Sequence, residues 1–331
     1  MKFIDMHCDT ISILHNQVQY GTHHELRENS LHIDLLKMKQ VGYLAQNFAM
    51  FVEKTPDRNP FEVALQMIDV FYQQLEKNSD LIAFAGSYDD IITNEKQGKM
   101  SALLTLEEGA IIKGTLPYLR TLYRLGARMM TLTWNYENEL ASPNANYTLC
   151  ESPDTTVPFT QWGLTECGFN TISEMEHLGM IIDVSHLSDA GFYDVLNATK
   201  KPFVASHSNA RAVCNHVRNL TDDMIKALSD RGGVMGINFY PPFLSNPVDS
   251  APCKGKLAEV VAHIKHIEQI GGIECIGLGS DFDGIPGNEE LPNALAMPLL
   301  YNALHQAGFS DDKIEKIFYQ NVLRVYKDIL K

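Results

Sequence analysis

Short hydrophobic runs alternate with amphipathic stretches along most of this chain. Eight short runs rich in aliphatic residues are predicted as β-strands, because such continuous runs are typical of sheets covered on both faces. The first strand begins at residues 2–4, and the others span 43–52, 100–106, 128–134, 179–185, 202–206, 233–239 and 275–279. Elsewhere apolar residues recur every three or four positions, which predicts helices. The predicted helices span 31–40, 59–75, 117–125, 164–178, 190–197, 221–230, 256–270 and 311–330.

The alternation of strands and helices predicts the fold class. Strands separated by helices form parallel sheets, and eight such units match a closed (β/α)₈ barrel of the TIM type. We expect one barrel domain over residues 1–331, with a short additional strand at 81–85. An open doubly wound sheet is the alternative. It would usually carry a G-x-G-x-x-G turn after its first strand, and this chain has none there.

Two polar stretches interrupt the pattern. The one that follows the first strand is predicted to be a loop with solvated histidines, at His15, His23, His24 and His32. The other, residues 135–163, is rich in Asn, Pro, Ser and Thr, and loops of this length are usually functional or disordered.

Composition narrows the class of protein. The chain has 331 residues, 45% hydrophobic and 21% charged, which is ordinary for a globular protein. Its formal net charge of -14 argues against nucleic acid or an anionic membrane as a partner. The six cysteines form no C-x-x-C pair and are expected to be reduced and structural. No signal-peptide pattern and no run of 18 apolar residues occurs, so a cytoplasmic location is expected.

Residues suited to metal binding and proton transfer follow five of the predicted strands. Barrel enzymes build their sites at the carboxyl ends of the strands. The side chains found there are His7, Asp9, Glu107, His186, His207 and Asp281. Each alone could be a hydrogen-bonded core residue or a helix-capping charge, but their joint placement at one rim predicts a shared site.

This set of side chains is sufficient for two divalent metal ions. Imidazoles and carboxylates suit a metal such as zinc, and one carboxylate can hold two ions roughly 3.5–4 Å apart. Glu107 could bridge in this way, and Asp281 would then be free to transfer protons. Cys8 lies between His7 and Asp9 but points to the other face of the strand, so we expect it to be packed rather than ligating.

Several ordered motifs resemble those of the renal (membrane) dipeptidase family, peptidase family M19. They are DMHCD at 5–9, LEEG at 106–109, IDVSH at 182–186, ASHS at 205–208, GSDFDG at 279–284 and NVLRV at 321–325. The resemblance implies a barrel with two zinc ions per chain. In the family's pattern His7 and Asp9 would bind one ion, His186 and His207 the other, and Glu107 both.

The resemblance also implies how a substrate would be bound. Asp281 would be the acid/base near the scissile nitrogen, and Arg218 would bind the substrate carboxylate. The other expected substrate-binding residues are Trp134, Tyr240 and Phe243.

Three positions depart from the family pattern. Trp134 stands where animal members have a histidine that contacts the substrate carbonyl, and Glu108 stands where the motif has glycine. Phe243 stands where the family has an aromatic residue that carries a hydroxyl group. We expect these differences to affect substrate fit more than the metal core, and Glu108 to add a charge near the site.

The expected function is zinc-dependent hydrolysis of dipeptides by a metal-bound hydroxide, in a soluble, bacterial-type member of the family. A metal-dependent hydrolase of N-acyl amino acids or other small amides on the same barrel is the alternative. Many of those enzymes bridge their metals with a modified lysine at a strand end, and no lysine ends the third to sixth predicted strands. A more remote alternative is a barrel that binds metal or small molecules without catalysis. The sequence leaves the oligomeric state open, with a homodimer as one option.

Overall fold

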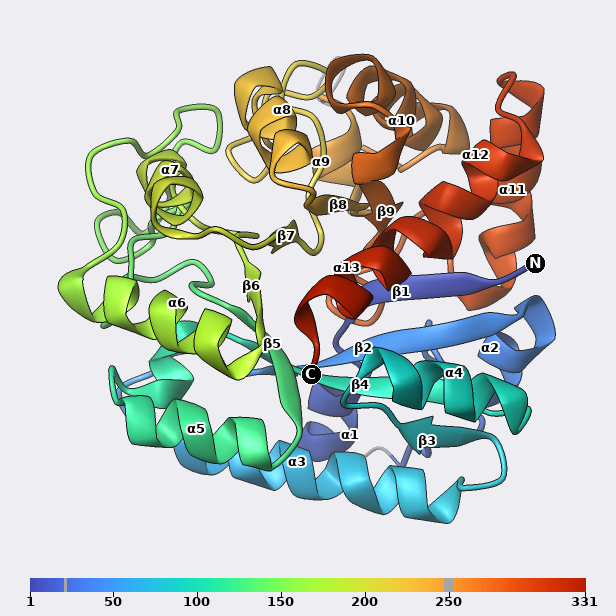
Figure 1. Ribbon diagram of the computed structural model, residues 1–331, viewed down its shortest axis with the longest axis horizontal. Helices are drawn as coiled ribbons and strands as arrows, with labels where there is room; N and C mark the ends of the chain where they lie inside the picture. The colour runs from blue at the N-terminus through green and yellow to red at the C-terminus, as the bar shows by residue number, and fades with distance from the viewer. Residues whose placement is uncertain (21–22, 247–252) are drawn as a thin grey trace.

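The computed structural model describes residues 1–20, 23–246 and 253–331 (Figure 1). Its strands are β1 Phe3–Cys8, β2 Tyr43–Phe51, β3 Ile82–Phe84, β4 Met100–Glu107, β5 Ala127–Thr131, β6 Ile181–Asp183, β7 Val204–Ala205, β8 Val234–Ile237 and β9 Ile276–Leu278. Its helices are α1 Thr10–Tyr20, α2 Leu35–Val41, α3 Pro60–Lys77, α4 Tyr88–Lys96, α5 Leu116–Arg124, α6 Glu166–Leu178, α7 Asp189–Ala198, α8 Asp222–Asp230, α9 Pro241–Leu244, α10 Leu257–Gly271, α11 Met297–Gln306, α12 Asp311–Glu315 and α13 Asn321–Ile329.

Eight of these strands close into a parallel barrel. The pairing runs β2-β1-β9-β8-β7-β6-β5-β4, and β2 also pairs with β4, which completes the circle. The short β3 lies outside this barrel and pairs with residues 100–102 of β4. It uses the same edge of β4 that pairs with β5 at residues 104–107. The predicted (β/α)₈ barrel is therefore confirmed, as is the additional strand.

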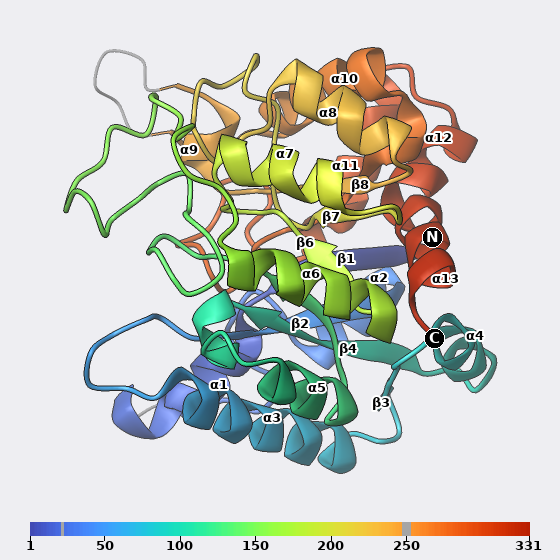
Figure 2. The same cartoon turned by 60° about the vertical axis from the view of Figure 1, so that its left-hand side comes forward.

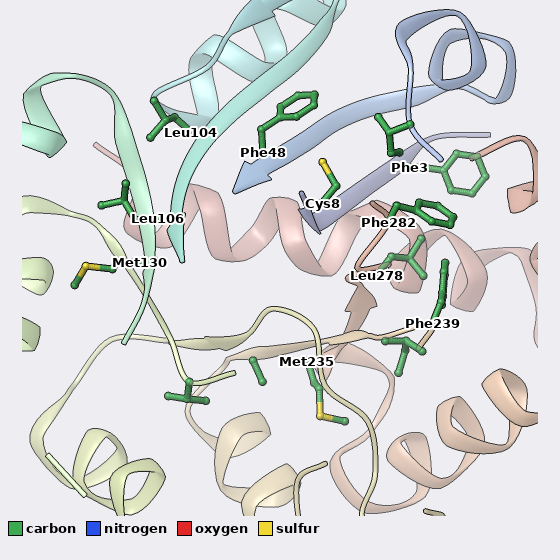
Figure 3. Packing of buried hydrophobic residues seen from close by; sticks show 14 of the residues in the cluster. Phe3, Cys8, Phe48, Leu104, Leu106, Met130, Met235, Phe239, Leu278 and Phe282 are labelled. Atoms are coloured by element: carbon green, nitrogen blue, oxygen red, sulfur yellow. The ribbon is translucent and has the colours of Figure 1, made fainter. Parts of the chain in front are cut away.

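Buried side chains fill two layers. The outer layer lies between strands and helices, and it includes Phe3, Cys8, Phe48, Leu104 and Phe282 (Figure 3). A register irregularity separates Asp5 from Cys8 in the pairing of β1 with β2. Cys8 is thus packed among apolar side chains, as predicted.

The inner layer fills the barrel near the amino ends of the strands. Ile4, Leu103 and Val234 belong to it, together with Val325 and Tyr326 of α13. Helix α13 lies across this end of the barrel (Figure 1). The predicted helix 311–330 is confirmed as α12 and α13, joined by a π-helical turn at 316–320. One end of the barrel is thereby closed, and the other is left for a site.

The polar loop predicted after the first strand is wrong over its first part, because helix α1 begins directly after β1. Ile11 and Leu14 stand one turn apart and are both buried, but the polar residues around them obscure this short stripe in the sequence.

Residues 23–34 contain no helix or strand, and of the histidines expected to be solvated His23 is exposed while His15 and His24 are half-buried. His32 is half-buried rather than solvated, and its backbone N–H donates to Asp283 at 2.7 Å. Helix α11 also has no counterpart among the predicted helices.

The predicted long segment 135–163 contains no helix or strand, but hydrogen bonds order it. Ala141 pairs with Leu164, and Pro143 pairs with Leu187, as isolated bridges. Figure 2 shows these green loops at the end of the barrel opposite α13. They therefore contribute to the open mouth of the barrel. None of the described helices is long and apolar enough to span a bilayer.

His263 of α10 is a buried imidazole that ties this helix to two neighbouring segments. Its Nδ1 accepts from the Ala210 N–H at 3.1 Å, so its Nε2–H donates to the Leu244 carbonyl at 3.0 Å. Burial, opposed by the bond to Leu244 and assisted by the nearby His266, lowers the pKa of His263 to about 4. Because the unfolded chain takes up a proton near pH 6.5 and the folded chain only near pH 4, this histidine removes stability as the pH falls between those values.

We expect the substitution His263→Asn to flatten this pH dependence. Asparagine keeps an acceptor for Ala210 but does not titrate, so the variant should be less stable at pH 7 by about 1–3 kcal/mol. Between pH 6.5 and 4 the wild-type chain should lose up to about 3 kcal/mol more stability than the variant. Urea unfolding of both metal-free proteins across this range measures the difference, and parallel curves would contradict the assignment.

Candidate active site

The predicted metal- and proton-handling side chains meet at the open end of the barrel. They are His7, Asp9, Glu107, His186, His207 and Asp281, each at or just after the carboxyl end of a strand. The first five are at most 8% exposed, and Asp281 is half-buried. Three overlapping groups of them have ligand atoms within 4.8 Å of one another, so they form a candidate metal-binding cluster.

Glu107 lies at the centre of this cluster. On β4 the side chains of Leu104 and Leu106 belong to the outer layer, so the alternation of the strand turns Glu107 inward. Its Oε2 lies 3.4 Å from Nε2 of His7, and its Oε1 lies 3.3 Å from Nε2 of His186. The same Oε1 is 3.6 Å from Nε2 of His207. Each carboxylate oxygen therefore faces different histidines.

A buried aspartate and a serine fix the proton position of His207. The Asp183 Oδ2 accepts from the Ser206 hydroxyl at 2.5 Å, and Nδ1 of His207 lies 2.7 Å from that serine oxygen. Since the hydroxyl proton is directed to the aspartate, the serine oxygen accepts from Nδ1–H of His207. The Nε2 lone pair of His207 is left free to bind a metal.

Asn135 does the same for His186. Its Oδ1 lies 2.9 Å from Nδ1 of His186 and can only accept, so the imidazole proton is on Nδ1. The Nε2 atoms of His186 and His207 are then both unprotonated, yet they lie 3.1 Å apart with Glu107 Oε1 nearby. Lone pairs brought this close together repel one another unless a cation lies among them. In addition, Asp9 Oδ1 is buried without a hydrogen-bond partner among the described residues. The donor set therefore fits a divalent metal.

The electrostatics of the cluster divide it in two. Burial lowers the pKa of His7, but Glu107 and Asp9 outweigh this effect and raise the pKa of His7 well above its usual value. Burial raises the pKa of Glu107 to about 7, against the opposing effect of His7. Burial, with neighbouring positive charges, holds the pKa values of His186 and His207 well below the usual value, so both are neutral. Neutral imidazoles are the form that binds metal.

Backbone strain is concentrated at this end of the barrel. His186, Asp281, Asp283 and Glu108 have positive φ angles of 69°, 63°, 68° and 98°. Positive φ costs free energy for residues other than glycine and usually persists where the surrounding structure imposes it, often at functional sites. At Gly284 a Cβ atom would lie 2.2 Å from Asp9 Oδ2, so only glycine fits beside the cluster.

A cavity of about 610 Å³ opens above the cluster, which is within the usual size range of small-molecule sites. It is lined by Glu107 and His186 on its floor, and by the predicted substrate-binding residues Arg218, Trp134, Tyr240 and Phe243. The structure therefore brings every predicted site residue to one place, either lining the cavity or, for His7 and His207, within the adjoining cluster.

Arg218 is a buried cation in the cavity wall. It is 4% exposed, and its guanidinium donates to the His207 carbonyl at 3.2 Å and reaches the Ser208 hydroxyl at 3.5 Å. Its Nε–H has no hydrogen-bond partner among the described residues. Burial lowers the pKa of Arg218 to about 10, so it keeps its charge at neutral pH. A buried, incompletely paired guanidinium is suited to an anionic ligand group.

Glu108 does not add its charge to the cavity in the way the sequence suggests. It is fully buried, and its carboxylate accepts from Ala110, Trp134 and Asn138 instead. Burial raises the pKa of Glu108.

Several residues that contact the cluster or line the cavity are absent from the sequence-based prediction. Asn135 lies in the long polar segment, where no pattern distinguishes it from its neighbours. Asp183 and Ser206 stand within two of the quoted motifs, and a polar residue in an otherwise apolar strand was the available signal, since buried polar groups need partners. His216 and Asp283 also line the cavity.

We expect removal of the Ser206 hydroxyl to weaken metal binding. In Ser206→Ala the Nδ1–H of His207 loses its acceptor, and loss of such a partner typically lowers metal affinity about 10–100-fold. Thr131→Val is the matched control, because it removes another hydroxyl that donates to Asp183, at 2.6 Å, and leaves the bond between Ser206 and His207 in place. Competition with a chromophoric chelator measures both affinities, and equal affinities in the two variants would contradict the assigned role.

Comparison with known proteins identifies the family. The protein-family model described as membrane dipeptidase (peptidase family M19) matches residues 1–331 of this chain. An uncharacterized dipeptidase of Schizosaccharomyces pombe is 34% identical, covering 98% of this chain and 80% of that protein. The dipeptidase tcpJ of Claviceps purpurea is 32% identical, covering 90% of this chain and 69% of that protein.

Solved structures share the fold. A metallo peptidase from Rhodobacter sphaeroides, liganded with a phosphinate mimic of the dipeptide L-Ala-D-Ala, has a TM-score of 0.88 at 23% identity and covers 99% of both chains. A dipeptidase of family M19 has a TM-score of 0.89 at 24% identity, covering 100% of this chain and 99% of the other. The match over the whole length confirms the resemblance seen in the motifs: this chain belongs to the membrane dipeptidase family, peptidase family M19.

Proposed function

We propose that this protein is a zinc-dependent dipeptidase with two metal ions per chain. The observation that carries the proposal is the position of Glu107, whose two carboxylate oxygens face different histidines on the floor of a cavity that also contains Arg218. A two-metal site beneath a pocket with a fixed cation suits a small amide substrate with a free carboxylate. Membership of the family supports the same reading.

His7 and Asp9 would hold one ion, His186 and His207 the other, and Glu107 would hold both. When bound, the metal pair would supply a water nucleophile at neutral pH and stabilise negative charge on the substrate carbonyl oxygen. Trp134 replaces the histidine that animal members direct at that carbonyl. Its indole cannot accept a proton, so its role here is to shape the cavity wall.

Arg218 would bind the carboxylate at the C-terminal end of the substrate. Its unpaired Nε–H and its buried charge provide the strongest anion-binding group among the described cavity residues. This contact would place the scissile bond over Glu107 and fix the substrate's direction. Tyr240 and Phe243 would flank that end, since Phe243 lies 5.4 Å from the Arg218 guanidinium and 4.8 Å from the Tyr240 ring.

Asp281 would deliver the proton to the leaving amine. Its carboxylate accepts from Asn238 Nδ2 at 2.9 Å, and Oδ1 lies 3.9 Å from Nε2 of His7, so it reaches the edge of the cluster without being central to it. Burial raises the pKa of Asp281, opposed by His7, which favours a group able to take up and release a proton.

The alternative substrate, an N-acyl amino acid, would use the same metal site and Arg218. Asp281, the acidic cavity residue that is not assigned to a metal ion or bonded to Thr10 and His32 as Asp283 is, favours a free ammonium group over a neutral acyl group. In the solved Rhodobacter sphaeroides structure the bound molecule is a dipeptide mimic. We therefore assign dipeptides as the substrate class. A barrel that binds metal without catalysis is the remaining alternative.

The test is hydrolysis by the zinc-loaded protein of matched substrates: free L,L- and L,D-dipeptides, their N-acetyl and C-terminal amide forms, and N-acyl amino acids. We expect free dipeptides to be cleaved fastest. Amidation should raise KM for the wild-type protein but have little effect in Arg218→Met, because the charge that recognises the carboxylate is already gone.

Asp281→Asn should retain its zinc and lose about 10²-fold or more in kcat.

Preference for N-acyl amino acids would assign the alternative substrate class. No turnover of any of these compounds by the zinc-saturated protein would favour the non-catalytic reading. An Asp281→Asn variant with normal kcat would remove that residue from the mechanism.

A further inference from the structure

Glu108 is a buried carboxylate that the proposed mechanism does not use. It follows Glu107 directly, has a positive φ angle of 98° and is 0% exposed. Its Oε1 accepts from the Ala110 N–H at 2.7 Å and from Asn138 Nδ2 at 2.5 Å. Its Oε2 accepts from the Trp134 N–H at 2.8 Å. Both oxygens are therefore used to join the end of β4 to the turn formed by residues 134–138.

Other contacts make the same connection tight. Asn138 also donates to the Leu132 carbonyl at 2.9 Å and accepts from the Leu140 N–H at 2.7 Å. At Gly109 a Cβ atom would lie 2.4 Å from the Leu132 carbonyl oxygen, just before the turn, and 3.2 Å from Asn138 Nδ2 within it, so the end of β4 is in direct contact with the turn. The turn has little freedom to move while the Glu108 bonds are in place.

This turn carries two side chains of the site. The Trp134 indole lines the cavity, with the Phe51 ring centroid 5.0 Å away and the Tyr136 ring 5.8 Å away. Asn135, the next residue, accepts from Nδ1 of His186 at 2.9 Å and so sets the proton position of that imidazole. The backbone N–H that Glu108 holds belongs to the first of these residues.

We propose that Glu108 is a positioning residue that fixes the turn 134–138 over the site. By binding the Trp134 N–H and Asn138, it sets the Trp134 wall of the substrate cavity and aligns Asn135 with His186. The carboxylate next to the central Glu107 thus links the metal site to the cavity wall. The expected effect of Glu108 on substrate and metal affinity rests on the proposed function, whereas its role in fixing the position of the turn does not.

The chain offers a reporter for this claim. It contains two tryptophans, Trp134 and Trp162, so Trp162→Phe leaves Trp134 as the single indole. In that background we compare Glu108→Gly and Glu108→Gln with the parent. Glycine removes the carboxylate and suits the positive φ angle. Glutamine keeps the size but has only one acceptor oxygen, so it cannot satisfy both sides of the turn.

A matched control lies away from the cavity. Glu176 of α6 also accepts from two backbone amides, those of Lys200 and Lys201, both at 2.9 Å. Both amides donate to the same oxygen, which glutamine would keep, so the control is the truncation Glu176→Ala. Glu176→Ala should lower the melting temperature without altering Trp134. Asn138→Ala is a second variant that breaks the same connection from the other side, for use if Glu108→Gly does not fold.

In the metal-free protein we expect acrylamide quenching of Trp134 to rise about twofold or more in Glu108→Gly and Asn138→Ala, with a smaller rise in Glu108→Gln. Zinc affinity, measured by chelator competition, should fall about tenfold, as expected when an imidazole loses its aligned partner. For cleaved dipeptides KM should rise more than kcat falls.

Folded Glu108 variants with a lower melting temperature, but with the parent's Trp134 quenching and zinc affinity, would overturn the proposal and leave Glu108 a purely structural role. The quenching measurement needs neither metal nor substrate. Failure of dipeptide hydrolysis would therefore reject the proposed function while this inference is still decided by the fluorescence.

Discussion

The arrangement of this site depends on one buried carboxylate shared between two groups of candidate ligands. Glu107 faces His7 through one oxygen and His186 and His207 through the other, at 3.3–3.6 Å. Groups this close and this buried are costly unless opposite charge compensates them. The same geometry that makes the cluster unfavourable without a cation makes it well suited to binding a metal ion. The barrel provides for this by bringing β1, β4, β6, β7 and β9 to one rim.

A second set of hydrogen bonds holds the candidate ligands in place. Asp183 and Ser206 orient His207, and Asn135 orients His186. The Asp5 carboxylate accepts hydrogen bonds from the hydroxyl and the N–H of Ser280, the residue before Asp281. Positive φ angles at His186 and Asp281 show that the backbone is strained where it presents these side chains. The packed lower half of the barrel, closed by α13, supplies the rigidity that such strain requires.

Much of this arrangement could be predicted from the sequence because strands of a parallel barrel have a simple signature. Continuous apolar runs gave the strand positions, and the rule that sites lie at strand ends selected all six rim residues. The failures had two causes, one local and one that depends on tertiary contacts. Helix α1 shows only a short apolar stripe, with Ile11 and Leu14, among polar residues. Asn135 and Glu108 act through partners far away in the sequence, and no periodicity reports such contacts. Glu108 was expected to bring its charge to the site, whereas tertiary hydrogen bonds direct it to Trp134 and Asn138.

The central claim is that Glu107 joins two metal positions, and the number and place of bound ions test it most directly. A crystal structure of the zinc-loaded protein, with anomalous scattering recorded on both sides of the zinc absorption edge, would locate them. The account predicts two anomalous peaks about 3.5–4 Å apart, one beside each oxygen of Glu107. A single peak, or two that do not both contact Glu107, at saturating zinc would contradict it.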